Sequence, residues 1–178
     1  MSVAEASGPL SARDREATAA STPRIAVIFF IVCLSPCLVF AGNKGWHSET
    51  DKIIELHSEY KKLIYIFHSV SDQELNLLYR HCYCLVQASL YEGYGLPVVE
   101  AMQHHKPVVC SNGGSLPEVG GEFCLYFDPY KPNELYQTLI SLLSSTELYT
   151  KTVNHIKTNY KPITWTESAM QLLEILLS

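Results

Sequence analysis

Two glutamates on either side of a glycine-containing turn are the side chains of this sequence best placed for chemistry. Glu92 and Glu100 lie in YEGYGLPVVEAM, residues 91–102, with seven residues between them. Carboxylates accept hydrogen bonds from paired hydroxyl groups, such as those of a ribose or a hexose. Two solvated surface charges could show the same spacing, so the interpretation depends on the elements around them.

The sequence around the glutamates predicts a strand, a tight loop and a helix. Residues 84–89, CLVQAS, have the apolar character of a strand, and Leu96 and Pro97 begin a helix, because proline is favoured in a first helical turn. In an open parallel sheet, ligands bind beyond the carboxyl ends of the strands. The loop at 90–95 lies there, and its two glycines allow close approach of a ligand. The free N–H groups of the helix N-terminus favour phosphate. A phosphate between two hydroxyl-binding acids corresponds to a nucleotide sugar.

Apolar runs alternate with segments of helical periodicity along most of the chain. The runs of strand length are Cys37–Ala41, Leu63–Phe67, Cys84–Gln87, Pro107–Ser111 and Cys124–Phe127. The helical segments are 48–63, 71–82, 96–105, 131–145 and 164–177. Matches to the S/T-x-x-E capping box at Ser71, Ser115 and Thr164 mark three helix starts. This alternation predicts an α/β fold with a doubly wound parallel sheet.

The first forty residues have several interpretations. Residues 1–24 are small, polar and aperiodic, which is typical of a disordered leader. The apolar run from Ile25 to Gly42 is interrupted by Ser35 and Pro36. It fits a signal peptide or membrane anchor, or two buried strands joined at the Ser-Pro turn, or one strand after an incidental segment. The role of 25–36 stays open here, with membrane association through 25–41 as one outcome, and the main domain is predicted at 37–178.

Composition excludes several classes of function. The net charge is −5 and no basic run occurs, so we predict no nucleic-acid partner. The six cysteines form no CxxC pair, which indicates reduced core thiols in a cytoplasmic protein. No ligand spacing of a known metal motif occurs among the seven histidines, so we predict no metal site.

The segment ASLYEGYGLPVVEAM resembles the E-x7-E signature of retaining GT-B glycosyltransferases. Other segments resemble the nucleotide-binding C-terminal domain of that group in order and spacing: LVFAGNKGW, VSDQELNLLYRHCYCLVQAS, KPVVCSNGGSLPEVGG, YFDPYKPNELYQTL and ITWTESAMQLLEIL. The similarity runs from about residue 38 to the end. It implies a Rossmann-like half of a GT-B fold.

The resemblance implies a hexosyltransferase, with mannosyl transfer favoured, and a role for each candidate residue. Glu92 is implied to contact the transferred sugar near its anomeric centre, and Glu100 to hold the ribose hydroxyls. Further donor contacts are implied for His68 and Ser69 at the nucleobase, for Lys44, and for the backbone N–H groups of Gly93, Tyr94, Gly95 and Leu96. For Lys44, an ordinary solvated loop lysine is an equal alternative. The donor, GDP-mannose or a UDP-hexose, is a substrate, and neither cofactor nor metal is expected.

The sequence also departs from that group. The N-terminal, acceptor-binding domain has no counterpart here, nor does the Arg and Lys pair that clamps the diphosphate; residues 1–36 hold no suitable basic pair. Two hypotheses follow. The chain is a donor domain that acts with a separate acceptor-binding chain, or it is a non-catalytic truncated module that binds a nucleotide or a partner. We expect weak or no transfer by this chain alone.

Overall fold

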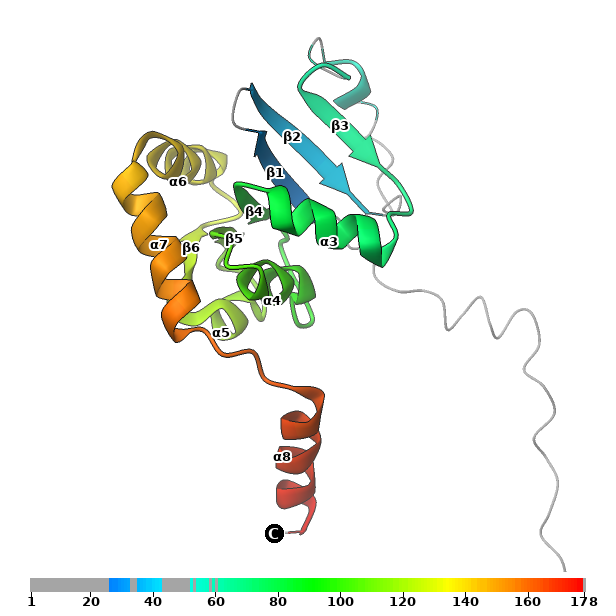
Figure 1. Cartoon of the computed structure of the whole chain (residues 1–178), viewed down its shortest axis with the longest axis vertical. Helices are drawn as coiled ribbons and strands as arrows, with labels where there is room; N and C mark the ends of the chain where they lie inside the picture. Colours follow the sequence, from blue (N-terminus) through cyan, green and yellow to red (C-terminus); the bar gives the residue numbers. More distant parts are fainter. Residues whose placement is uncertain are drawn as a thin grey trace, which may run out of the picture.

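The protein, seen here in a computed structural model, folds as one six-stranded sheet with helices on its faces (Figure 1). The structure describes residues 26–32, 35–42, 52, 54–57, 59 and 61–177. The strand order is β3-β2-β1-β4-β5-β6. The strands are β1 (Ala26–Val32), β2 (Ser35–Ala41), β3 (Ile64–Phe67), β4 (Cys84–Gln87), β5 (Val108–Ser111) and β6 (Cys124–Phe127).

The helices alternate with the strands as the sequence predicts. They are α3 (Asp72–His81), α4 (Leu96–Gln103), α5 (Leu116–Gly120), α6 (Pro132–Ser144), α7 (Thr146–Asn159) and α8 (Trp165–Leu177), with a 3₁₀ turn, η1 (Gly121–Phe123). Helix α7 was not predicted. Most of the helix predicted at 48–63, and Lys44, fall outside the described residues.

The α/β fold is confirmed, and strand β1 is the exception to its parallel sheet. Strand β2 pairs parallel with β3, and β4, β5 and β6 pair parallel in turn. Strand β1 is antiparallel to both β2 and β4. Only two residues separate Val32 from Ser35, whereas a parallel pair needs a crossover of about a dozen residues or more. A hairpin is therefore the connection that this stretch of chain can make.

The hairpin matches one interpretation of the apolar N-terminal run, that of two strands, but Ser35 and Pro36 are the first residues of β2 and not the turn between the strands. Residues 26–32 and 35–41 both lie within the sheet. In the described part of the chain, none of the helices has the length and hydrophobicity to span a bilayer. Membrane association through 25–41 stays a prediction, as do the domain limits at 24, 36 and 178.

The hydrophobic core lies on both faces of the sheet, so the fold is doubly wound. On strand β4, Leu85 faces a cluster that includes Met102 of α4, and Val86 faces a second cluster that includes Leu142 of α6. Successive residues of a strand point to opposite faces, which explains this division. Helices α3, α4 and α5 cover one face, and α6 covers the other.

Two of the three predicted capping boxes form. Ser71 and Glu74 exchange hydrogen bonds at the start of α3, and Thr164 and Glu167 do so before α8. The box predicted at Ser115 is wrong. The Ser115 hydroxyl makes no cap hydrogen bond to α5 and instead contacts the loop that carries Glu92.

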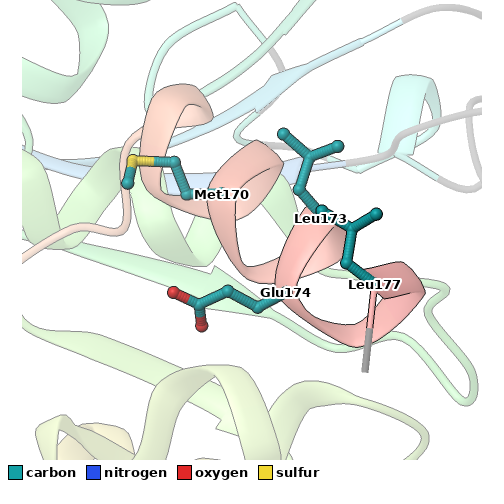
Figure 2. Close-up of a pocket in the computed structure, with 4 residues that line it drawn as sticks. All are labelled: Met170, Leu173, Glu174 and Leu177. Atoms are coloured by element: carbon teal, nitrogen blue, oxygen red, sulfur yellow. The ribbon is translucent and has the colours of Figure 1, made fainter.

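Helix α8 lies apart from the sheet, beyond the end of α7 (Figure 1). One of its faces carries Met170, Leu173 and Leu177, which line a shallow surface hollow with Glu174 (Figure 2). These three apolar side chains are 58%, 55% and 85% exposed. The amphipathic pattern predicts a helix with a buried apolar face. In the structure that face does not pack against the rest of the described fold.

Candidate functional site

Five strands end at one edge of the sheet, and the candidate residues gather there. Because β2 and β4 are each antiparallel to β1, they run parallel to one another. The carboxyl ends of β2 to β6 therefore share an edge. The loops that leave β3, β4 and β5 at this edge are residues 68–71, 88–95 and 112–115.

The N-terminus of α4 lies behind the loop that follows β4. Gly95 is the N-cap, and its φ of 86° lies in the left-handed region that favours glycine. A Cβ at Gly95 would also approach Leu116 Cδ2 to 2.7 Å. Among the described residues, the N–H groups of Gly93, Tyr94, Gly95 and Leu96 have no hydrogen-bond acceptor. Such a run of free donors at the positive end of a helix suits an anion.

The Glu92 carboxylate is held by two side chains from the end of β4. Its Oε1 atom accepts hydrogen bonds from Gln87 Nε2 at 2.8 Å and from Ser89 Oγ at 2.7 Å. Gln87 also donates to Ser89 Oγ at 2.7 Å, so the three groups form a closed triangle. Glu92 is half-buried, whereas Gln87 is fully buried.

The backbone of the Glu92 loop is clamped by the loop after β5. Ser115 Oγ donates to the Glu92 carbonyl oxygen at 3.0 Å. Gly114, with φ of 57°, packs so closely that a Cβ would lie 2.9 Å from the Glu92 nitrogen. Ser111 Oγ donates to the Ser89 carbonyl oxygen. The loop is therefore fixed by its neighbour on the sheet as well as by its own side chains.

Glu100 is held from the other side, by helix α3. Tyr79 Oη donates to Glu100 Oε2 at 2.9 Å, and Tyr79 is only 2% exposed. The His104 ring stacks on the Tyr79 ring with their centroids 5.7 Å apart. Burial lowers the pKa of His104, and the positive charges of Lys106, Arg80 and His105 lower it further. A neutral imidazole thus packs against the tyrosine that positions Glu100.

His68 and Ser69 lie where predicted, in a loop at the carboxyl end of β3. They help to line a pocket of about 270 Å³ between that loop and α3. Its other lining residues are Phe67, Val70, Glu74, Leu77 and Leu78. His68 Nδ1 lies 3.2 Å from the Gly42 carbonyl oxygen, and Ser69 has a φ of 57°. An apolar floor with polar groups at the rim can accept a planar ring.

Both carboxylates are held by neutral donors. Within the described part of the chain, neither Glu92 nor Glu100 is in a salt bridge. The Gln87 amide and the hydroxyl groups of Ser89 and Tyr79 orient the two carboxylates. None of these donors carries a charge that would offset the charge of the carboxylate. The described residues also contain no group of three or more His, Cys, Asp or Glu side chains that could hold a metal ion. The prediction of no metal site stays a prediction.

The sequence matches a family of sugar-transferring enzymes. Residues 35–159, well over half of the chain, match the sequence profile described as Glycosyl transferases group 1. The chain belongs to this family. It is 40% identical over 93 residues to the O-antigen chain mannosyltransferase B of Escherichia coli, covering 52% of this chain and 24% of that protein.

Solved structures support the same GT-B fold for this group 1 glycosyltransferase chain. The sucrose-phosphate synthase of Thermosynechococcus elongatus matches with a TM-score of 0.59 at 22% identity, over 81% of this chain and 39% of that one. The C-terminal domain of a group 1 glycosyl transferase from Francisella tularensis matches with a TM-score of 0.53 at 25% identity, over 64% and 61%. The chain thus spans well under half the length of the mannosyltransferase and of the synthase.

Sequence reasoning missed the residues that orient the two acids in this group 1 glycosyltransferase. Gln87, Ser89, Ser115 and Tyr79 were not predicted as site residues, yet each donates to Glu92 or Glu100. One signal was available: Gln87 is polar at the end of an apolar strand, and a buried polar side chain is the informative exception in a core. Tyr79 carried no such signal, because an aromatic residue on a helix is ordinarily core.

Proposed function

We propose that this chain binds a nucleotide sugar and is the donor domain of a retaining hexosyltransferase, with mannosyl transfer favoured. One observation carries the proposal: Glu92 and Glu100 flank a helix N-terminus whose preceding N–H groups have no acceptor in the described chain. The mannosyltransferase relative supports the choice of sugar. GDP-mannose is the first donor to test, and UDP-hexoses are the next.

The order of features along the edge fits the order of groups in such a donor. Helix α3 lines the ring-sized pocket through Leu77 and Leu78, and its next residue, Tyr79, contacts Glu100. Glu100 lies within α4, and Glu92 lies in the loop just before the N-terminus of that helix. Nucleobase, ribose, diphosphate and hexose follow one another in the same sequence. The predicted roles of His68, Ser69, Glu100, the four N–H groups and Glu92 are all compatible with this alignment.

The chemistry that this arrangement supports is electrostatic. In transfer, the bond between the anomeric carbon and the diphosphate oxygen breaks, and negative charge grows on the diphosphate. An acceptor hydroxyl oxygen bonds to the same carbon, and its proton passes to the departing diphosphate. Fixed N–H groups at the positive end of α4 stabilise that charge without reorganising. The Glu92 carboxylate lies beside the transferred sugar in this proposal. There it accepts hydrogen bonds from sugar hydroxyl groups, and its negative charge stabilises positive charge at the anomeric centre. In this proposal the chain uses no cofactor.

An acceptor-binding part is needed to complete the reaction. The chain spans 24% of the mannosyltransferase relative, and residues 35–159, which match the family, include Glu92 and Glu100. We propose that acceptor binding comes from elsewhere, in the same protein or on a separate chain. This chain alone is expected to bind donor but to transfer weakly or not at all. Sugar transfer at ordinary enzyme rates by the purified chain would contradict that expectation.

Calorimetric titration tests the proposal directly. The full chain is titrated with GDP-mannose, UDP-glucose and an ADP-sugar, and with each bare nucleotide. Glu100→Gln should abolish saturable binding of both sugar and nucleotide, because the amide replaces one of the two charged acceptor oxygens with an NH2 donor and so cannot pair each oxygen with a ribose hydroxyl. Glu92→Gln should spare the bare nucleotide and reduce the preference for the sugar. Unchanged binding by Glu100→Gln would rule out the ribose assignment.

Gly93 provides a substitution that tests ligand approach alone. A Cβ at Gly93 meets no atom within 4 Å, and its φ is not in the left-handed region. Gly93→Ala should therefore leave the melting temperature unchanged or slightly raised. It should still weaken donor binding, because the added methyl group occupies the space that the sugar and diphosphate need. Unchanged affinity in a folded Gly93→Ala variant would place the ligand elsewhere.

A further inference from the structure

Gln87 is a costly residue for its position in the core. It ends strand β4, whose other members, Cys84, Leu85 and Val86, are buried and apolar. Gln87 is fully buried too, and its Oε1 atom has no hydrogen-bond partner among the described residues. An unpaired buried acceptor destabilises a fold, and native proteins rarely retain one without a reason. An apolar side chain of the same length would avoid this cost.

The orientation of the Gln87 amide is set by the glutamate. The Nε2 group donates both to Glu92 Oε1 and to Ser89 Oγ. Turning the amide over would place its oxygen against a carboxylate oxygen and break both hydrogen bonds. In the observed orientation, the Nε2 group donates to both Ser89 and Glu92, whereas Oε1 has no partner among the described residues.

The triangle leaves one carboxylate oxygen available. Both donors, Gln87 Nε2 and Ser89 Oγ, converge on Glu92 Oε1. Among the described residues Oε2 has no hydrogen-bond partner. Because Glu92 stands in a loop and has several side-chain rotamers, two hydrogen bonds to one oxygen fix where the other oxygen lies. Because both donors are neutral, the carboxylate keeps its charge for a ligand.

We propose that Gln87 is a positioning residue that fixes the Glu92 carboxylate and thereby sets the preference of the site for a nucleotide sugar over the bare nucleotide. This inference rests on the proposed function, in which Glu92 contacts the sugar. It differs from a packing role because it acts through Glu92 alone. It also explains why the fold keeps an amide with an unpaired oxygen in its core.

The first test needs no ligand. Nuclear magnetic resonance of the full chain reports the side-chain amide protons of Gln87, which should resonate downfield and exchange slowly with water. In Glu92→Ala they should move upfield and exchange faster, while backbone resonances of β6 stay in place. Leu85→Met, a volume-conserving change on the same strand, is the control and should leave the Gln87 amide unchanged. If the chemical shifts and exchange rates of the Gln87 amide protons are the same in Glu92→Ala as in the wild type, the inference is wrong.

The second test measures sugar preference by calorimetry with GDP-mannose against GDP, and UDP-glucose against UDP. Gln87→Met should leave the affinity for the bare nucleotide unchanged and lower the preference for the sugar by about tenfold, the effect of one hydrogen bond to a charged group. Its melting temperature should stay close to that of the wild type, because removal of the unpaired oxygen offsets the loss of the two hydrogen bonds that Nε2 donates. Ser89→Ala should show a smaller loss of preference, and Leu85→Met none.

A double-mutant cycle separates positioning from packing. If Gln87 acts through Glu92, adding Gln87→Met to Glu92→Gln causes no further loss of sugar preference. Additive losses, or equal losses for the sugar and the bare nucleotide, would overturn the inference. If the wild type binds sugar and bare nucleotide alike, the proposed function of Glu92 fails, and the resonance test still decides whether Gln87 holds its carboxylate.

Discussion

Glu92 and Glu100 lie on either side of one helix N-terminus, yet the fold positions them in different ways. Glu100 belongs to α4, so its backbone is set by the helix, and among the described residues one hydrogen bond, from Tyr79, orients its carboxylate. Glu92 belongs to a loop. It needs two side-chain donors at Oε1 and a clamp on its backbone from the loop after β5.

The difference shows how the cost of order is divided. A helix orders its own backbone, so an acid within it needs only one distant contact. Each residue of a loop loses conformational entropy when it is ordered, and contacts with neighbouring elements must offset that loss. The Glu92 side of the site therefore depends on more residues than the Glu100 side. Substitutions there should have the larger effects.

The largest effect is expected from Gly114→Ala, which removes the clamp on Glu92. The new Cβ would lie 2.9 Å from the Glu92 nitrogen and 3.0 Å from its carbonyl oxygen, at a φ of 57°. We expect a lower free energy of unfolding in urea titrations and loss of sugar preference in calorimetry.

Gly121→Ala is its matched control. Gly121 has a φ of 49° with no atom within 4 Å of an added Cβ. It should cost about 1–3 kcal/mol of unfolding free energy from backbone strain alone, with donor binding intact. Equal stability losses and equal binding in the two variants would show that the clamp contributes nothing to the site.

The next effect is expected on the Glu100 side, from Tyr79→Phe. The change removes only the hydroxyl that donates to Glu100 Oε2. Stability should fall by about 1.5–3 kcal/mol, the usual value of one hydrogen bond to a charged group. Affinity should fall equally for GDP and GDP-mannose, because Glu100 is proposed to hold the ribose. A change confined to the sugar would reverse the roles of the two acids.

A smaller effect is expected from Ser115→Ala. Because the Ser115 hydroxyl contacts the Glu92 carbonyl and does not cap α5, its loss should loosen the Glu92 loop without shortening the helix. We expect a loss of about 1 kcal/mol in unfolding free energy and a modest decrease in sugar preference. Ser71→Ala, which removes a true cap on α3, is the comparison: it should lower stability similarly and leave sugar preference unchanged.

The smallest effect is a pH dependence through His104. Its pKa is lowered in the fold, first by burial and then by neighbouring positive charges. The unfolded chain, with an ordinary pKa near 6.5, therefore takes up a proton more readily than the folded chain. Neutral His104 contributes to the free energy of unfolding at pH values above the pKa of the unfolded chain. This contribution is lost as the pH falls below that pKa.

Urea titrations at pH 8 and at pH 5.5 measure this dependence. His104→Gln should lose less unfolding free energy between the two pH values than the wild type does. An equal loss in both proteins would show that His104 does not carry the dependence.

Much of the fold could be predicted from local pattern. Strands β4 and β6 occupy the residues predicted, and β2, β3 and β5 agree to within a few residues, because buried strands appear in a sequence as short apolar runs. For β1 the sequence left a strand and a membrane anchor open. Helix α7 was missed, since only part of one face packs and its sequence is largely polar. The antiparallel placement of β1 was also missed, although a connection of only two residues, between Val32 and Ser35, excludes a parallel crossover.

The sequence by itself determined the E-x7-E spacing, the glycine turn and the helix start, because each depends on residues close together in the chain. Only the tertiary structure decided what orients the acids. Tyr79 lies 21 residues from Glu100, and Ser115 lies 23 residues from Glu92. Contacts at such separations depend on which strands become neighbours in the sheet. Local sequence patterns do not record that choice, because it is made by the packing of the whole domain.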